Sequence, residues 1–143
     1  MRVMVIVKVS QESESTAKPK RKDLEAMGKF NEELVKAGVM LAMDGLHPSS
    51  RGKRVRFDGA KRTVIDGPFT ETKELIAGFW LWRVKSLQEA VEWLKRAPFD
   101  QTEVEIRPVF EAEDFGDEFT PEMHERYTRM RAEAEQLAKN TKR

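Results

Sequence analysis

Two polar residues follow apolar, strand-like runs of the sequence, and both could take part in proton transfer. His47 comes just before Pro48, and Asp66 comes just before Gly67 and Pro68. An imidazole exchanges protons near neutral pH, and a neighbouring carboxylate can orient it or act as a base itself. Both residues also have ordinary structural roles, because a strand-end His can bind a loop carbonyl and an Asp before Gly-Pro can form an Asx turn. His47 and Asp66 are therefore candidate catalytic residues, with these alternatives open.

Five further residues are candidates for ligand binding: Phe69, Lys73, Glu74, Arg83 and Arg107. Lys73 and Glu74 follow the Asp66 turn and could contact a ligand at a cavity mouth, or they could be a solvated charge pair. Arg83 and Arg107 lie in predicted strands, where an unpaired charge is costly. They are expected to hold an anion or to pair with a carboxylate such as Glu105 or Asp66.

Composition excludes several kinds of chemistry. The 143 residues include no Cys, so disulfides, thiolate zinc sites and Cys nucleophiles are excluded. His124 has no partner at a metal-binding spacing, and no serine completes a catalytic triad with His47 and Asp66. The sequence predicts no metal and no cofactor. Proton transfer or addition–elimination on a small organic substrate fits these residues best.

Charge and hydropathy limit the partners. The 26 basic and 25 acidic residues give a net charge of +1, so charge gives no reason to expect binding to nucleic acid or to an anionic membrane. No apolar run approaches the roughly 20 residues of a membrane-spanning helix. The first apolar run is not followed by a small-residue cleavage site. We therefore expect a cytoplasmic protein.

The pattern of apolar residues predicts the elements that must position these side chains. Strands are predicted at 3–9, 39–46, 54–57, 62–65, 76–84 and 103–110, with Asp58-Gly59 turning the two middle strands into a hairpin. Helices are predicted at 19–37, ending at Gly38, and from the capping box Ser86 to Glu89 as far as Pro98. Residues 10–18 have no large apolar side chain and are predicted to form a mobile loop.

This order of elements predicts an α+β fold of the split βαβ, or ferredoxin-like, type, with both helices on one face of an antiparallel sheet. The hairpin is expected to join the other strands in a meander. The run 76–84 is apolar on both faces, so the uncovered face would expose either Phe79 and Leu81 or Trp80 and Trp82. A second copy packed on that face would cover it, which predicts a homodimer with a cavity between the sheets.

The last 33 residues form a separate segment. Residues 111–125 carry seven acids and no Lys or Arg, whereas 126–143 carry six basic residues and two acids. Thr120 suits an N-cap and Pro121 the first helical turn, so a helix is predicted from Pro121. Met123, Tyr127, Met130, Ala134 and Leu137 form a narrow apolar stripe that should dock on another surface. The predicted organisation is a domain at 1–110 followed by an acidic linker and amphipathic helix at 111–143.

Several motifs in this sequence resemble the YCII-related family, in the branch of DGPF-domain proteins. The resemblance runs from the first strand to about Phe110. It includes Ala37-Gly38-Val39, Gly45-Leu46-His47-Pro48, Asp66-Gly67-Pro68-Phe69 with Glu71, Lys73 and Glu74, and Glu105-Ile106-Arg107-Pro108. The resemblance implies a ferredoxin-like fold, usually dimeric, and a motif His and Asp that fall on His47 and Asp66.

Two functions remain open on this basis. The first is a small-molecule enzyme or binding module, with His47 and Asp66 in a cavity at the dimer interface. The second is a non-catalytic interaction protein, for example a sigma-factor-associated transcription regulator, because some relatives are fused to sigma factors. This chain carries no added helix-turn-helix. Catalysis requires His47 and Asp66 to lie close together beside an accessible cavity, whereas an interaction role does not.

Overall fold

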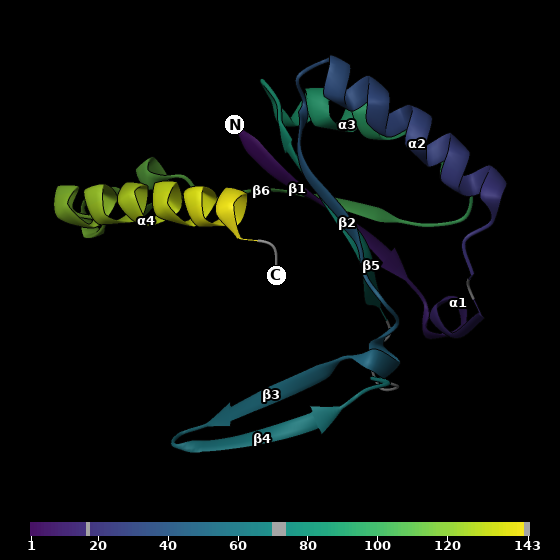
Figure 1. Ribbon diagram of the computed structural model, residues 1–143, viewed down its shortest axis with the longest axis horizontal. Coiled ribbons are helices and arrows are strands. Elements are labelled where there is room, and N and C mark those ends of the chain that lie inside the picture. Colours follow the sequence, from purple (N-terminus) through teal and green to yellow (C-terminus); the bar gives the residue numbers. More distant parts are fainter. Residues whose placement is uncertain (17, 70–73, 142–143) are drawn as a thin grey trace. The chain divides into compact units, whose positions relative to one another are not determined.

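The computed structural model describes residues 1–16, 18–69 and 74–141. The chain divides into two compact units, Met1–Val109 and Phe110–Arg143, and each is described by itself. The elements of the first unit are, in chain order, β1 (Arg2–Val9), α1 (Gln11–Thr16), α2 (Arg21–Lys36), β2 (Met40–Gly45), η1 (Ser49–Arg51), β3 (Lys53–Asp58), β4 (Lys61–Asp66), β5 (Leu75–Arg83), α3 (Leu87–Lys95) and β6 (Val104–Pro108) (Figure 1).

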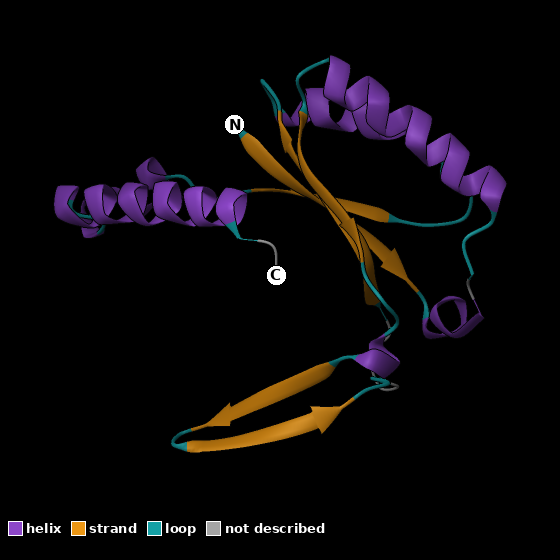
Figure 2. Ribbon diagram, in the orientation of Figure 1, coloured by secondary structure: helices purple, strands orange, loops and turns teal. Residues whose placement is uncertain are grey.

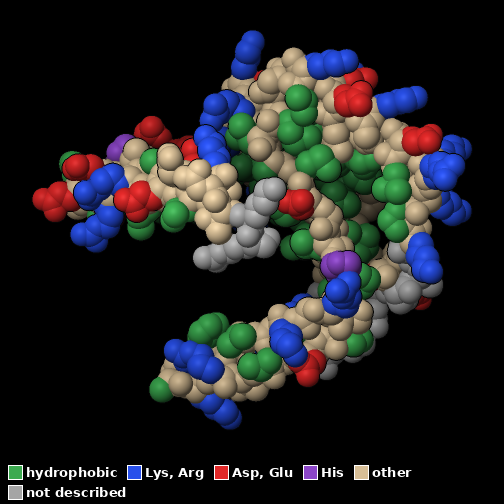
Figure 3. All heavy atoms as spheres, in the orientation of Figure 1, with side chains coloured by type: hydrophobic (Ala, Val, Ile, Leu, Met, Phe, Trp, Pro, Cys, Tyr) green, Lys and Arg blue, Asp and Glu red, His purple; other side chains and the backbone are tan. Residues whose placement is uncertain are grey.

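Four strands of this unit form one antiparallel sheet in the order β2-β5-β1-β6. Helices α2 and α3 follow β1 and β5 in the chain, and both lie on the same face of the sheet (Figures 1 and 2). The mixed α+β fold is therefore confirmed, and its strand order is consistent with the ferredoxin-like arrangement. Lys and Arg side chains gather on the outward side of α2, where the amphipathic helix meets solvent (Figure 3).

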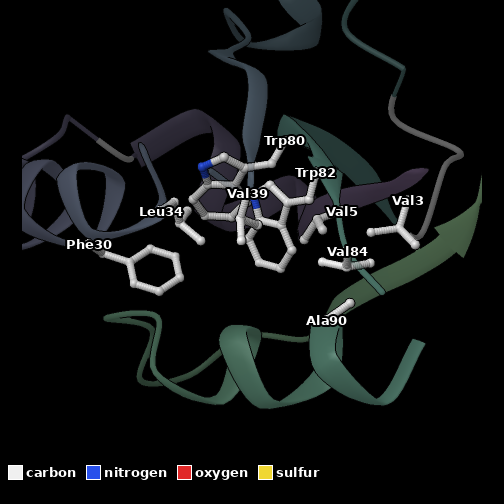
Figure 4. Packing of buried hydrophobic residues seen from close by; sticks show 9 residues of the cluster. All are labelled: Val3, Val5, Phe30, Leu34, Val39, Trp80, Trp82, Val84 and Ala90. Atoms are coloured by element: carbon white, nitrogen blue, oxygen red, sulfur yellow. The ribbon is translucent and has the colours of Figure 1, made fainter. Parts of the chain in front are cut away.

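The core lies between the sheet and its two helices. Val3 pairs with Trp82 and Val5 with Trp80 across β1 and β5, so these four side chains point to the same face. They are buried with Phe30 of α2, and Figure 4 shows this cluster from close by. The two tryptophans therefore face the helices. The neighbouring residues of β5, Phe79 and Leu81, point to the opposite face, which neither helix covers.

The hairpin has the predicted turn but not the predicted place. Strands β3 and β4 pair from Lys53↔Asp66 to Asp58↔Lys61, with Gly59 at a φ of 58° in the turn. They form a two-stranded sheet of their own, so the predicted meander is wrong. Strand β5 already pairs with β1 on one side and β2 on the other, which leaves the hairpin no place beside it. The hairpin residues are almost all exposed.

The predicted mobile loop at 10–18 is also corrected, because Gln11–Thr16 form the short helix α1. Ser10 lies just before this helix, and its Oγ accepts a hydrogen bond of 3.1 Å from the backbone N–H of Ser13. Apolar periodicity missed α1 because this helix has no apolar face. The N-cap is the signal that could have found it.

The second unit contains a 3-10 segment, η2 (Ala112–Glu118), and the helix α4 (Pro121–Asn140). The predicted terminal helix is confirmed, including its cap: the Thr120 hydroxyl accepts a hydrogen bond of 3.2 Å from the backbone N–H of Met123. Phe119, just before the cap, lies 6.0 Å from the His124 ring, as in a hydrophobic staple. All residues of α4 are exposed.

Candidate functional site

A cavity of about 410 Å³ lies at the base of the hairpin, where it leaves the main sheet. Its wall combines residues of α1, of η1 and its flanking loop, of the start of β3, and of the chain around the start of β5. The lining residues are Glu14, Leu46, His47, Pro48, Ser49, Arg51, Gly52, Arg54, Phe69, Glu74, Leu75 and Ile76. Segments far apart in the sequence therefore meet at one site.

The Ser49 hydroxyl ties three of these segments together. It donates a hydrogen bond of 2.6 Å to Oε1 of Glu14 in α1, and it accepts one of 3.2 Å from the backbone N–H of Phe69. The backbone N–H of Gly67 donates to the carbonyl oxygen of Gly52 at 3.0 Å and closes the base of the hairpin. These bonds hold the cavity wall in place although its segments belong to loops and short helices.

Two arginines carry positive charge into the cavity wall. Nη1 of Arg51 lies 3.0 Å from both ring nitrogens of His47. The turn η1 creates this contact, because it brings residue 51 back towards residue 47. The guanidinium carbon of Arg54 lies 3.9 Å from the centroid of the Phe69 ring, in a cation–π arrangement. His47 and Arg51 are both exposed, so a ligand can reach them.

The two carboxylates of the wall already have hydrogen-bond donors. Glu14 accepts from Ser49, and Glu74 accepts from Nζ of Lys8 at 3.0 Å. Lys8 also binds Glu105 at 2.8 Å. The hydrogen bonds that Lys8 donates to Glu105 and, to a smaller extent, to Glu74 raise the pKa of Lys8, and the same bond to Glu105 lowers the pKa of Glu105. Lys8 therefore stays charged, and it offsets the negative charge of Glu74.

Of the two predicted catalytic residues, only His47 lines the cavity. Asp66 lies at the end of β4, where its carboxylate forms an ion pair with Lys53 across the hairpin. Both partners of this ion pair are well exposed to solvent. In this structure the Asp66 carboxylate therefore binds Lys53 of the other hairpin strand. In the cavity wall, the carboxylate that accepts a hydrogen bond from the segment after His47 is that of Glu14, through Ser49.

The predicted ligand-binding residues divide into two groups. Phe69 and Glu74 line the cavity. Arg83 and Arg107 do not: Arg83 is exposed opposite Arg2 at the end of β5, and Nε of Arg107 lies 3.9 Å from Glu105. Lys73 lies outside the described residues. The tertiary structure thus gathers only part of the predicted set.

Four polar residues of the cavity wall were not among the sequence candidates: Glu14, Ser49, Arg51 and Arg54. Ser49 and Arg51 follow His47-Pro48 at short spacing, so a turn after Pro48 was the available signal. Arg54 was part of a hairpin whose position was predicted differently. Glu14 has no sequence signal, because its segment has no apolar periodicity and its composition predicts a loop.

Within residues 1–16, 18–69 and 74–141, no group of three His, Asp or Glu side chains could hold a metal ion. No helix in the same ranges is both long enough and apolar enough to span a bilayer.

The first unit is therefore an α+β domain whose antiparallel sheet has both helices on one face. The cavity lies at one end of this sheet, beside the base of the hairpin. The family model of the YCII-related domain matches residues 1–113, and the chain belongs to this family. It is also similar to an uncharacterized protein of Rhizobium meliloti (strain 1021), with 31% identity over 106 residues, which cover 70% of this chain and 86% of that relative.

Proposed function

We propose that the cavity binds a small organic anion and that His47 exchanges a proton with it. The observation that carries this proposal is the environment of Arg51. Its guanidinium contacts an imidazole, and within the described ranges it has no carboxylate partner. Both wall carboxylates, by contrast, have donors of their own. An incoming carboxylate would supply the anionic partner that Arg51 lacks.

The rest of the wall suits the carbon skeleton of such a ligand. Leu46, Phe69 and Ile76 provide apolar surface, and Ile76 is 51% exposed. A volume of about 410 Å³ is within the range of roughly 300 to 1,000 Å³ found for small-molecule sites. The ligand class is therefore a small carboxylate with an apolar body, bound by Arg51 at one end and by these side chains at the other.

His47 is the group that would exchange a proton with the bound ligand. Its ring is exposed in the cavity wall, and it lies beside the guanidinium that would hold the ligand's carboxylate. A carbon or oxygen next to that carboxylate would lie within reach of the ring, which suits proton transfer. In this proposal Asp66 fixes the base of the hairpin through Lys53, and His47 acts without it.

The experiment uses the fact that the chain has only two histidines, His47 and His124. Ring signals of His47 in NMR spectra should shift on titration with benzoate and stay in place with benzamide, which has the same ring and no charge. His124 lies outside the cavity and serves as an internal control. Replacing Arg51 by Gln should abolish the benzoate response.

An equal response to benzamide, or a benzoate response that survives in Arg51→Gln, would contradict the proposal. The proposal would also be contradicted if neither compound moved the His47 signals at millimolar concentration while the protein stayed folded.

We also propose that the chain belongs to the DGPF branch, on the basis of Asp66-Gly67-Pro68-Phe69, and that it is a homodimer. The second proposal rests on the uncovered sheet face. Met4, Leu81 and Ala42 are adjacent there in the strand register, as are Ile6 and Phe79. Charged residues border this apolar cluster, because Asp44 pairs with Phe79, Glu105 with Ile6 and Arg107 with Met4. Exposed apolar patches with a polar rim mark protein–protein interfaces.

A further inference from the structure

The helix α4 carries an apolar stripe with heptad spacing. Met123, Tyr127, Met130, Ala134 and Leu137 alternate at intervals of four and three residues, as in positions d and a of a coiled coil. The four larger side chains of this stripe are between 46% and 64% exposed. A helix of 20 residues is marginal in water by itself, so the stripe requires a partner surface.

We propose that this partner is α4 of a second copy of the chain, packed antiparallel. The charges of α4 support this choice through their positions beside the stripe. The helix carries the acids Glu122, Glu125, Glu133 and Glu135 and the bases Arg126, Arg129, Arg131 and Lys139, so neither half of it has a net charge. The charged residues that flank the stripe therefore distinguish the orientations.

The residues that flank the stripe select the same orientation and also the register. In a parallel pair, Arg126 at position g faces Arg131 at position e of the second copy, which is repulsive. In an antiparallel pair with Tyr127 layered against Met130, Arg126 faces Glu133 of the second copy. The two-fold symmetry makes this attractive contact twice. At the remaining flanking positions His124 faces Arg131 of the second copy, and the two-fold symmetry makes this contact twice as well.

Arg126 and Glu133 are available for these contacts. Among residues 110–141 of the second unit, the structure places no salt bridge on either of them. They are separated by seven residues on one helix, about 10.5 Å at 1.5 Å per residue, so they cannot pair within a chain. The same layering places the large Met123 against the small Ala134 of the second copy, which lets the helices approach closely.

Disulfide trapping in the full-length chain tests the orientation, because the protein has no Cys of its own. Met123→Cys and Ala134→Cys are prepared as single variants and oxidised alone and as an equimolar mixture. The antiparallel register brings position 123 of one copy beside position 134 of the other. The mixture should therefore yield a covalent dimer, while each single variant alone should not, because its cysteines lie about 16 Å apart along the axis.

A variant with Cys at Ala132, on the opposite side of α4, measures random collision. Covalent dimer from Met123→Cys alone would show a parallel pair and overturn the proposal. A mixture that yields no more dimer than Ala132→Cys would also overturn it. That result would mean that the stripe docks on another surface, such as the first unit, or stays solvated.

Charge exchange tests the register independently. In the mixed Cys background, Arg126→Glu should lower the yield of covalent dimer about fivefold to tenfold, because it places two acids together at both symmetric contacts. Glu133→Arg should have the same effect, and the double exchange should restore the yield. In a parallel pair, Arg126→Glu would instead raise the yield, since residue 126 would then attract Arg131. Unchanged yields in both single variants would contradict the assigned register.

Discussion

Gly67 lies so close to the carbonyl oxygen of Ser49 that a Cβ on Gly67 would overlap that oxygen. The backbone of Ser49 belongs to the turn η1, and the Ser49 side chain binds both Glu14 and Phe69. The close approach therefore connects the Asp66-Gly67-Pro68-Phe69 motif directly to the cavity wall. The close approach explains why a glycine is required at position 67, and this explanation does not depend on catalysis.

Replacing Gly67 by Ala should disrupt the cavity while the helix-covered core remains folded. The added methyl must displace η1, and the hydrogen bonds of Ser49 to Glu14 and Phe69 would be lost with it. Far-UV circular dichroism should stay close to that of the original protein, whereas the His47 ring signals should move or broaden. Gly45→Ala is the matched control, because a Cβ there meets no atom within 4 Å. Unchanged His47 signals in Gly67→Ala would show that the turn adapts easily.

The uncovered sheet face predicts a dimer. Sedimentation at micromolar concentration should give a species of at least twice the 16.6 kDa of one chain. Leu81→Lys should weaken association through this face, because Leu81 is adjacent to Met4 and Ala42 and a charge there would be desolvated in the interface. Phe57→Lys is the control, since Phe57 is 69% exposed on the separate hairpin. If Leu81→Lys associates as strongly as the Phe57 variant, the sheet face is not the interface.

Trp80 and Trp82 should respond differently to the same substitution. Both are buried, but Nε1 of Trp80 donates a hydrogen bond of 2.9 Å to Asn31, whereas the buried Nε1 of Trp82 has no partner among the described residues. Trp→Phe removes similar volume at each position. Only at Trp80 does it also break a hydrogen bond, which contributes about 1 kcal/mol.

The loss in free energy of unfolding should therefore be larger for Trp80→Phe than for Trp82→Phe, by about 1 kcal/mol. Urea unfolding followed by circular dichroism measures both. Equal losses, or a larger loss at Trp82, would mean that the Asn31 hydrogen bond contributes little. They would also result if the space left by the smaller Phe ring is filled less well at position 82 than at position 80.

Glu105 should make stability depend on pH in the acid range. Its pKa is lowered in the folded protein, first by the hydrogen bond from Lys8 and then by the charge of Lys8. The folded state therefore binds the Glu105 proton less readily than the unfolded chain does. The resulting stabilisation is fully present above the ordinary carboxyl pKa and is lost as pH falls through the lowered pKa.

The variant Glu105→Gln tests this sign. It should be less stable than the original protein at pH 7, and the difference should shrink as pH falls below about 4. Glu103→Gln is a suitable control, because it removes the same kind of charge from an exposed side chain two residues away. A difference that stayed constant between pH 7 and pH 3 would show that Lys8 and Glu105 do not interact appreciably in solution. The pKa of Lys8 is raised in the folded protein, so its contribution to stability is fully present below the pKa of lysine in the unfolded chain. Lys8 therefore adds no pH dependence of stability in the acid range.

Local patterns in the sequence were sufficient for most elements. Period-two alternation in residues 3–9 and the capping residues Ser86 and Thr120 act within a few residues of the chain, so the strands and helices that depend on them could be predicted. The Asp58-Gly59 turn was found for the same reason. Such interactions join residues that are neighbours in the chain, so they can be predicted without knowing the fold.

Two other features depended on partners distant in the chain. Only the pairing of β1 with β5 decides that Trp80 and Trp82, and not Phe79 and Leu81, face the helices, because both faces of β5 are apolar. The hairpin stands apart because β1 and β2 already occupy both edges of β5. Edge occupancy is a property of the whole sheet, and no local pattern contains it.

The candidate site shows the same division. The sequence identified His47, Phe69 and Glu74 by residue type and position, but it also grouped Asp66 with them, whereas the structure pairs Asp66 with Lys53. Side chains as far apart in the chain as Glu14 and Ser49 meet only after α1 and η1 have docked at one end of the sheet. The sequence alone determined which groups are available, and the tertiary structure decided which of them meet, because a hydrogen bond requires atoms within about 3 Å and only the folded chain brings distant segments that close.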